Sequence, residues 1–217
     1  MDRKARVTSL SFTELQKLFE RRSTLVELDS GAVLFQEGDP GEAVFSLDYG
    51  RLEVSVMSED GRKLVLDIVR PDAFVGEISL FDPGPRTATL NALEKVRLRR
   101  LSNQIVLDEL EHNPKIAIEL IRLAGLRMRW MNGQLEEQVF LSLPSRLARR
   151  ILYLTEIDNP HLKLNQSQLG EFVGATREGV SNILRGWKQD GTLELSRGGL
   201  RILDREKLNY ISEQDFH

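Results

Sequence analysis

The sequence predicts an α+β protein in three successive parts: a jelly-roll-like roll of short β-strands, one long helix, and a small helical unit that closes with a β-hairpin. Three observations lead to this fold class. Glycines separate short apolar runs between residues 25 and 105, no proline interrupts residues 115–143, and two short helices with strong start and stop residues follow Leu164. A chain of 217 residues can bury a core in one domain or two.

The N-terminal part has the rhythm of strands joined by tight turns. The glycines that separate its apolar runs are Gly31, Gly38, Gly41, Gly50 and Gly61. Residues 51–56 alternate in period two, which predicts a half-buried strand. Its two faces carry Leu52, Val54 and Val56 on one side and Arg51, Glu53 and Ser55 on the other. Residues 63–69 and 88–101 continue the β character, so residues of roughly 25 to 105 form the predicted roll.

A candidate anion site lies in the stretch F-V-G-E-I-S-L-F-D-P-G-P-R-T-A-T. Glu77 can accept from a sugar hydroxyl, and backbone N–H groups at a short helix start near Ile78 and Ser79 face an anion. Arg86, nine residues after the glutamate, offers a bidentate fork to phosphate oxygens, with Thr87 beside it as a neutral donor. These groups suit a small sugar-phosphate. A Glu77–Arg86 salt bridge that only pins a loop is the alternative.

A long helix is predicted from Lys115, and Leu143, Pro144 and Ser145 break it. One apolar stripe steps by four and three for about three heptads, which favours a two-helix coiled coil. That stripe consists of Ala117, Ile121, Ala124, Met128, Met131, Leu135 and Gln138. A second stripe, suited to packing on the roll, consists of Ile116, Leu120, Leu123 and Trp130. We therefore expect a homodimer, and the alternative is a single buried helix in a monomer.

The C-terminal part has the pattern of two helices joined by a tight turn. Asn165 caps the first helix with Gln168 at its third position, and Gly174 ends that helix. Thr176 caps the second helix, so the pair forms a helix-turn-helix motif. Residues 193–203 read as a hairpin around an Arg-Gly-Gly turn, which would form a wing. An earlier helix is expected to start at Arg146 and to carry Arg146, Arg149 and Arg150 on its surface.

In such a motif the exposed N-terminal residues of the second helix enter the major groove of DNA. Arg177 can pair bidentately with guanine, Glu178 can accept from cytosine, and Asn182 can address adenine or a phosphate. The other residues assigned to DNA binding are Gln166, Ser167, Thr176, Ser181, Arg185 and Arg197. Alternatives are a solvated helix start, a local Arg177–Glu178 ion pair, and a helix pair that serves only for packing.

Taken together, the roll, the L-F-x-E-G-D-x-G-E phrase, the candidate anion site, the long helix and the T-R-E-x-V-S-x-I-L phrase resemble one family. It is the cAMP receptor protein/fumarate-nitrate-reduction regulator (CRP/FNR) family of bacterial transcription factors, and the resemblance runs from about Phe12 to Leu203. It implies a cyclic-nucleotide-binding β-roll at residues 1–112, a dimerisation helix and hinge at 113–142, and a winged helix-turn-helix domain at 143–217. It also implies allosteric control by cAMP or cGMP.

The resemblance assigns roles to individual residues. Ribose and phosphate contacts fall on Gly76, Glu77, Ser79, Arg86 and Thr87, and base reading falls on Arg177 and Glu178. Met131 and Asn132 stand where cAMP-responsive members carry adjacent hydroxyl residues that touch adenine. Asn132 can donate and accept at a purine edge, whereas Met131 cannot. Asn182 stands where those members place a second base-reading arginine, so we expect a shifted operator half-site.

Composition excludes several other classes. The absence of cysteine rules out disulfides, a thiol nucleophile and a Cys-ligated iron–sulfur cluster. His112, His161 and His217 are far apart in sequence, and we expect neither a metal site nor a catalytic cofactor. No run approaches the roughly 20 apolar residues of a membrane span, and no signal peptide begins the chain, so we expect a cytoplasmic protein. Residues 141–217 hold 11 basic against 10 acidic residues, a net of +1, so DNA binding should depend on local placement of arginines.

We therefore expect a homodimer that binds a palindromic operator in double-stranded DNA and contacts RNA polymerase. Three alternatives remain. The first is the same regulator with another effector or none, and the second is a cyclic-nucleotide-binding subunit that acts on a protein partner. The third is an enzyme that cleaves phosphodiesters, against which the chain offers no nucleophile–base set and no Walker-type loop.

Overall fold

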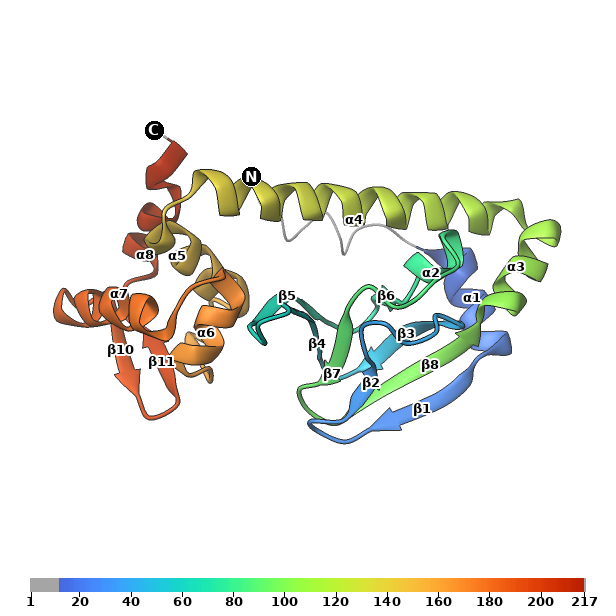
Figure 1. The fold of residues 1–217 in the computed structure, drawn as a ribbon, viewed down its shortest axis with the longest axis horizontal. Helices are drawn as coiled ribbons and strands as arrows, with labels where there is room; N and C mark the ends of the chain where they lie inside the picture. The colour runs from blue at the N-terminus through green and yellow to red at the C-terminus, as the bar shows by residue number, and fades with distance from the viewer. Residues whose placement is uncertain (1–11, 217) are drawn as a thin grey trace. The chain divides into compact units, whose positions relative to one another are not determined.

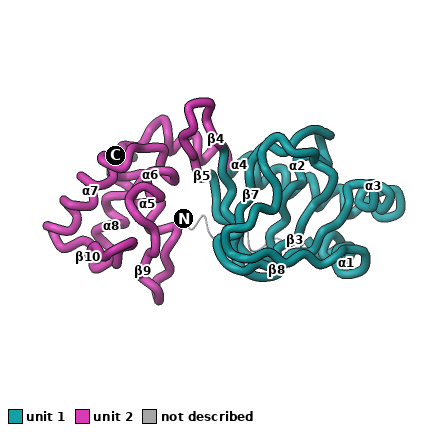
Figure 2. Tube along the Cα trace, turned by 60° about the horizontal axis from the view of Figure 1, so that its bottom comes forward, with its two compact units in different colours: residues 1–56, 66–130 teal, residues 57–65, 131–217 magenta. Residues whose placement is uncertain are grey.

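The computed structural model describes residues 12–216, so the first eleven residues and His217 lie outside it (Figure 1). The chain divides into two compact units (Figure 2). One comprises residues 1–56 and 66–130, and the other residues 57–65 and 131–217. The three-part division at residues 113 and 143 stays a prediction. Within the described range no helix is long and apolar enough to cross a membrane, and no group of three metal-binding side chains lies together.

The first unit is built around two four-stranded sheets, with strand orders β1-β8-β3-β6 and β2-β7-β4-β5. The strands are β1 (Thr24–Leu28), β2 (Val33–Phe35), β3 (Ala43–Tyr49), β4 (Leu52–Met57), β5 (Lys63–Val69), β6 (Phe74–Val75), β7 (Thr89–Ala92) and β8 (Val96–Ser102). Strand β3 pairs antiparallel with β8, with Phe45 opposite Arg100, and β4 pairs antiparallel with β7, with Val54 opposite Leu90. One core fills the roll, and it includes Leu47, Leu52, Val75, Leu90 and Leu98. The β-roll prediction is confirmed.

Strand β4 is buried more completely than its alternation predicts. Glu53 and Ser55 are only 8% and 4% exposed, whereas Val54 and Val56 are half-buried. The prediction of a half-buried strand is therefore wrong, because alternation reveals an apolar face but not what covers the polar one.

A second core joins three helices to the roll: α1 (Thr13–Arg22), α3 (Asn103–His112) and the first half of α4 (Pro114–Phe140). Its members include Leu15, Phe19, Val44, Phe74, Val106, Ile116, Leu120 and Leu123. Three of the four residues of the predicted packing stripe, Ile116, Leu120 and Leu123, thus lie in this core, and the fourth, Trp130, is half-buried. Glu119 on the same side is 7% exposed and accepts from the N–H groups of Glu14 and Leu15 at 3.1 and 2.8 Å. The Glu119 carboxylate thus provides hydrogen-bond acceptors for free N–H groups in the first turn of α1, whose own N-cap residue makes no side-chain hydrogen bond.

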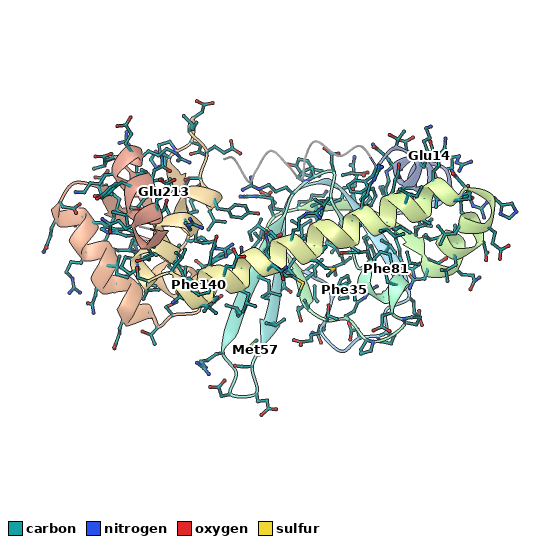
Figure 3. The ribbon with its side chains drawn as sticks, turned by 90° about the horizontal axis from the view of Figure 1, so that it is seen from above. Glu14, Phe35, Met57, Phe81, Phe140 and Glu213 are labelled. Atoms are coloured by element: carbon teal, nitrogen blue, oxygen red, sulfur yellow. The ribbon has the colours of Figure 1, made fainter. Side chains whose placement is uncertain are left out.

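The other face of α4 is an exposed apolar stripe. Its exposed members are Ile118, Ile121, Met128, Met131, Leu135 and Val139, each between 51% and 68% exposed. Phe140, at the end of the helix (Figure 3), is 71% exposed. Ile118 and Val139 also belong to this stripe. Of the residues that the sequence suggested, Ala117 is half-buried, and Gln138 is exposed and accepts a hydrogen bond from Arg146.

The second unit contains the helix-turn-helix motif and the wing. Its elements are α5 (Leu143–Leu154), β9 (His161–Leu162), α6 (Gln166–Val173), α7 (Arg177–Gln189), β10 (Leu193–Ser196), β11 (Gly199–Ile202), α8 (Arg205–Glu213) and the 3-10 turn η2 (Gln214–Phe216). The predicted capping box of Asn165 and Gln168 is present, and Gly174 ends α6 with a left-handed φ of 64°. The Thr176 side chain accepts from the N–H of Gly179. The pair of helices and the hairpin therefore form as predicted.

Of the three arginines predicted on the surface of α5, Arg146 and Arg149 are half-buried and Arg150 is buried, so the prediction is wrong for Arg150. Arg150 is 8% exposed, and its guanidinium lies 5.6 and 5.7 Å from the ring centres of Tyr153 and Phe172. It also donates to Oε1 of Gln134 at 2.6 Å. Arg149 donates to the carbonyl of Ser212 at 2.9 Å. Helix α8 and the last turns of α4 cover this face of α5, which the helical pattern of α5 alone does not reveal.

Candidate nucleotide and DNA sites

Arg86 is the best-supported side chain of the candidate anion site. It is 7% exposed, and its Nη1 donates to the carbonyl of Gly76 and to the Ser79 hydroxyl at 3.0 and 3.1 Å. Its Nη2 donates to the carbonyl of Ala43 at 2.7 Å. The guanidinium carbon lies 4.2 Å from the ring centre of Phe35, which Figure 3 labels. Nε is buried and has no partner among the described residues. These contacts fix the orientation of the guanidinium.

Two glycines let the loops around Arg86 approach one another. Gly76 has a φ of 79°, and a Cβ there would lie 2.6 Å from Nη1 of Arg86. A Cβ on Gly41 would lie 2.2 Å from Cβ of Ser79. Backbone hydrogen bonds also join Arg86 to the loop that contains Gly41: its N–H donates to the carbonyl of Asp39, and its carbonyl accepts from the N–H of Gly38. The L-F-x-E-G-D-x-G-E phrase therefore supports the site from a second loop.

Burial also changes the electrostatics of Arg86. Removal from water lowers the pKa of this guanidinium from its ordinary value, and the nearby negative charge of Glu77 acts in the opposite direction. An arginine remains charged in any protein, so this buried cation attracts an anion. The site is electrostatically suited to a phosphate.

Glu77 pairs with an arginine that sequence reasoning missed. Its Oε1 accepts from Nε of Arg127 on α4 at 3.1 Å, and Glu77 is 3% exposed. Arg127 also donates to the carbonyl of Phe74 at 3.0 Å and lies 3.9 Å from Asp67. The alternative of a Glu77–Arg86 salt bridge does not hold, because the carboxylate faces α4. A signal was present in the sequence, since Arg127 occupies the next step of the stripe that packs on the roll.

The remaining nucleotide-site residues are not gathered around Arg86 in the same way. Gly76 and Ser79 accept hydrogen bonds from Arg86, whereas Glu77 is buried and pairs with Arg127, and Thr87 and Ile78 are exposed. Ile78 begins the short helix α2 (Ile78–Phe81), as predicted. Met131 and Asn132 are exposed on α4 and belong to the second unit, so their place at the nucleotide stays a prediction.

The predicted base-reading residues are exposed on the first turns of α7. Within residues 12–216, neither Arg177 nor Glu178 makes a side-chain hydrogen bond or ion pair, so the local ion pair does not form. A groove of about 450 Å³ lies between the two helices and the wing. Its lining includes Gln166, Ser167, Arg177, Ser196 and Gly198. The second unit thus brings the α6 start, Arg177 and the wing to one groove.

The other DNA-assigned residues also lie on α7 or the wing. Arg197 is exposed at the hairpin turn, and Ser181 is half-buried. Asn182 and Arg185 are exposed one turn apart, and Nη1 of Arg185 lies 3.5 Å from Oδ1 of Asn182.

Comparison with known proteins assigns both units. The family model described as "Cyclic nucleotide-binding domain" matches residues 25–113, and the one described as "Crp-like helix-turn-helix domain" matches residues 145–211. A roll of this type followed by this helix-turn-helix unit defines a DNA-binding transcription regulator with a ligand-binding domain. The chain belongs to the CRP/FNR family of transcription regulators.

The relatives agree with this assignment. A "CRP-like cAMP-activated global transcriptional regulator" of Mycobacterium tuberculosis is 29% identical over 191 residues, which are 84% of this chain and 85% of that protein. The "cAMP-activated global transcriptional regulator CRP" of Pasteurella multocida is 27% identical over 164 residues, 72% of this chain and 78% of that protein. A solved CRP/FNR-family regulator from Eubacterium rectale has the same fold, with a TM-score of 0.81 at 20% identity over 95% of this chain and 97% of that one. These relatives are regulators rather than enzymes, as the sequence predicts.

Proposed function

We propose that this protein is a homodimeric, sequence-specific transcription regulator whose DNA binding is controlled by a cyclic nucleotide, cAMP in the first place. The main observation in favour of nucleotide binding is that the guanidinium of Arg86 is buried and held in a fixed orientation beside Ser79. The names of the Mycobacterium tuberculosis and Pasteurella multocida relatives support cAMP as the first candidate. We further propose that residues 1–112, 113–142 and 143–217 are its functional parts and that RNA polymerase is a partner.

The proposed nucleotide contacts follow from the chemistry of the candidate anion site. Arg86 and Thr87 provide donors for the phosphate, with Gly76 and Ser79 beside them. Glu77 accepts from the ribose hydroxyl, which must share the carboxylate with Arg127. Asn132, on the long helix, is the proposed contact to the base.

Homodimerisation is supported by the exposed stripe of α4. A row of apolar side chains at heptad spacing that remains 51–68% exposed in one chain favours pairing with the same row of a second copy. Gly125 lies within this stripe, where a Cβ would meet nothing closer than 3.7 Å, so the centre of the stripe has room for a partner side chain. A Leu135→Glu variant should sediment as a monomer, whereas Arg122→Ala, an exposed change on the same helix, should remain dimeric.

Control of DNA binding would be a shift between two populations. The nucleotide favours the state in which the two recognition helices lie about 34 Å apart, one DNA turn. It can do so only through its different affinity for the two states, and such couplings are typically about 1–3 kcal/mol. Arg127 offers a route for this coupling, since it joins the ribose-binding carboxylate to α4.

Isothermal titration of the purified protein with cAMP and then cGMP tests the proposal. Saturable binding that Arg86→Ala abolishes and Arg122→Ala preserves is the expected result. Arg86 also ties Ala43 to Gly76, so circular dichroism must establish that the Arg86→Ala variant is folded at the titration temperature. Unchanged nucleotide binding by a folded Arg86→Ala variant would show that the candidate anion site is not the nucleotide site.

A second candidate is the same DNA-binding regulator with another effector or none. Two observations favour it: Glu77 is already paired with Arg127, and Met131 carries no hydroxyl for a base. No heat with either nucleotide, together with specific DNA binding in their absence, would select this candidate.

A further inference from the structure

Arg86 has few hydrogen-bond donors left for a phosphate. A guanidinium carries five N–H donors, two on each Nη and one on Nε. Nη1 donates to the carbonyl of Gly76 and to the hydroxyl of Ser79, and Nη2 donates to the carbonyl of Ala43. The donor on Nε is buried and has no partner among the described residues. One further N–H, on Nη2, remains for a ligand, so Arg86 acts on an anion mainly through its charge.

A second arginine lies on the same side of the sheet. Arg100, near the end of β8, stands directly opposite Phe45 of β3 in the antiparallel register. The side chains of such a pair project from the same face of the sheet, with Cβ atoms about 5 Å apart. Phe45 belongs to the core of the roll, and its ring centre lies 5.8 Å from the guanidinium carbon of Arg86. Arg86 and Arg100 therefore both neighbour one aromatic ring at the inner face of the roll.

Neither arginine has a bound counter-charge within residues 12–216. The side chain of Arg100 is exposed and makes no hydrogen bond or ion pair in that range, so its donors are available to a ligand. Arg86 forms no ion pair there either, since the carboxylate of Glu77 pairs with Arg127. A buried cation is costly unless an opposite charge compensates it. The arrangement therefore favours an anion beside both guanidiniums.

The electrostatics of Arg86 agree with a second cation close by. Burial lowers the pKa of Arg86 most, and the positive charge of Arg100 lowers it further. The carboxylates of Glu77, Asp39 and Glu42 act in the opposite direction. An anion bound between Arg86 and Arg100 would relieve the repulsion between the two guanidiniums.

We propose that Arg100 is a second phosphate-binding residue, which donates two hydrogen bonds to the phosphate group that the charge of Arg86 attracts. The planar guanidinium fork matches two oxygens of one phosphate. This inference rests on the proposed nucleotide site and specifies its ligand as a phosphate ester, whichever base the ligand carries. The register of β3 and β8, rather than the stretch around Glu77 and Arg86, brings Arg100 to the site.

Isothermal titration with cAMP and cGMP tests the proposal on wild type and three variants of β8. Arg100→Ala should weaken binding of the nucleotide about 10- to 100-fold, which is the size expected for hydrogen bonds to a charged group. Arg100→Lys keeps the charge but loses the fork, so its affinity should lie between the two. Arg97→Ala is the matched control, because Arg97 alternates to the other face of the same strand and pairs with Glu27. Its affinity should equal that of wild type.

The outcomes separate this inference from nucleotide control. Wild-type affinity in Arg100→Ala or in Arg100→Lys would overturn the bidentate contact and leave the nucleotide proposal standing. A wild-type protein that binds neither nucleotide would overturn the nucleotide proposal, and thermal melting then tests Arg100 by itself. Inorganic phosphate, compared with chloride at equal ionic strength, should raise the melting temperature of wild type and Arg97→Ala but not of Arg100→Ala. An equal response of all three proteins to phosphate would overturn the inference as well.

Discussion

Replacement of Arg127 by alanine should destabilise the first unit measurably, because it leaves a buried carboxylate without its cation. Glu77 is 3% exposed and accepts from Nε of Arg127 at 3.1 Å. The same change removes the 3.0 Å hydrogen bond to the carbonyl of Phe74 and the positive charge near Asp67. The perturbation therefore affects α4, β5, β6 and the start of α2 at once.

The magnitude follows from the burial of the two partners. Loss of one member of a fully buried ion pair costs about 3–5 kcal/mol. The side chain of Arg127 is 30% exposed, so water partly screens the pair and we expect a loss of about 2–3 kcal/mol. At about 3 °C per kcal/mol for a unit of this size, the melting temperature should fall by roughly 6–9 °C.

Calorimetric melting of four proteins measures this effect: wild type, Arg127→Ala, Glu77→Ala and the double variant. The double variant should be more stable than the sum of the single losses predicts, by at least about 1 kcal/mol, because it buries no unpaired charge. Arg122→Ala is the control on the same helix and should melt within about 0.5 kcal/mol of wild type. Strict additivity of the two single changes would refute the ion pair as the source of the loss.

Three further predictions concern single positions. Gly41→Ala should cost about 1–3 kcal/mol, since its Cβ would lie 2.2 Å from Cβ of Ser79, and a melting curve measures the loss. Arg150→Ala should destabilise the second unit by about 2–4 kcal/mol in urea unfolding, because it removes ring contacts and leaves the half-buried Oε1 of Gln134 without its donor. The Ser145 hydroxyl, followed by the backbone and side-chain hydrogen bonds of Ser142, the N-cap residue of α5, lowers the pKa of Asp215 from its ordinary 3.8. The stability that this carboxylate contributes is present above that value and lost as the pH falls through the folded-state pKa, so wild type and Asp215→Asn should differ at neutral pH and converge in acid.

The Gly41→Ala and Arg150→Ala predictions each have a control within the chain. Gly186 lies in α7 with open space around it, so Gly186→Ala should stabilise the protein by about 0.5–1 kcal/mol. Lys188→Ala matches Arg150→Ala as a surface charge removal in the same unit and should be nearly neutral. A Gly41→Ala variant as stable as wild type, an Arg150→Ala variant that unfolds at the wild-type urea concentration, or an Asp215→Asn difference that persists in acid would each contradict its prediction.

Residues that act on their own chain neighbours could be predicted from the sequence. The capping box of Asn165 and Gln168 and the left-handed Gly174 depend on backbone groups only a few residues away. The stripe Ile116, Leu120, Leu123 faces the core as its spacing predicts, but α5 begins at Leu143 rather than at Arg146, because a proline is tolerated in the first turn of a helix. Local geometry fixes these features whatever surrounds them.

Features that depend on distant segments were missed or misplaced. Arg127 and Glu77 are 50 residues apart, and no local pattern joins them. Arg150 is a charged residue, which the sequence alone places on the surface. It is buried because Phe172 of α6 and Gln134 of α4 contact it. Polar Glu53 is covered in the same way.

By itself, the sequence determined the family, the β-roll, the long helix, the winged helix-turn-helix, and the residue types of the candidate phosphate site. The tertiary structure alone decided that Arg86 is fastened by Ala43 and stacked on Phe35, and that Glu77 is shared with α4. The physical reason is the range of the interactions. Periodicity, caps and turns are set by bonds within a few residues, whereas a buried charge takes whichever partner the packing of remote elements brings within about 3 Å.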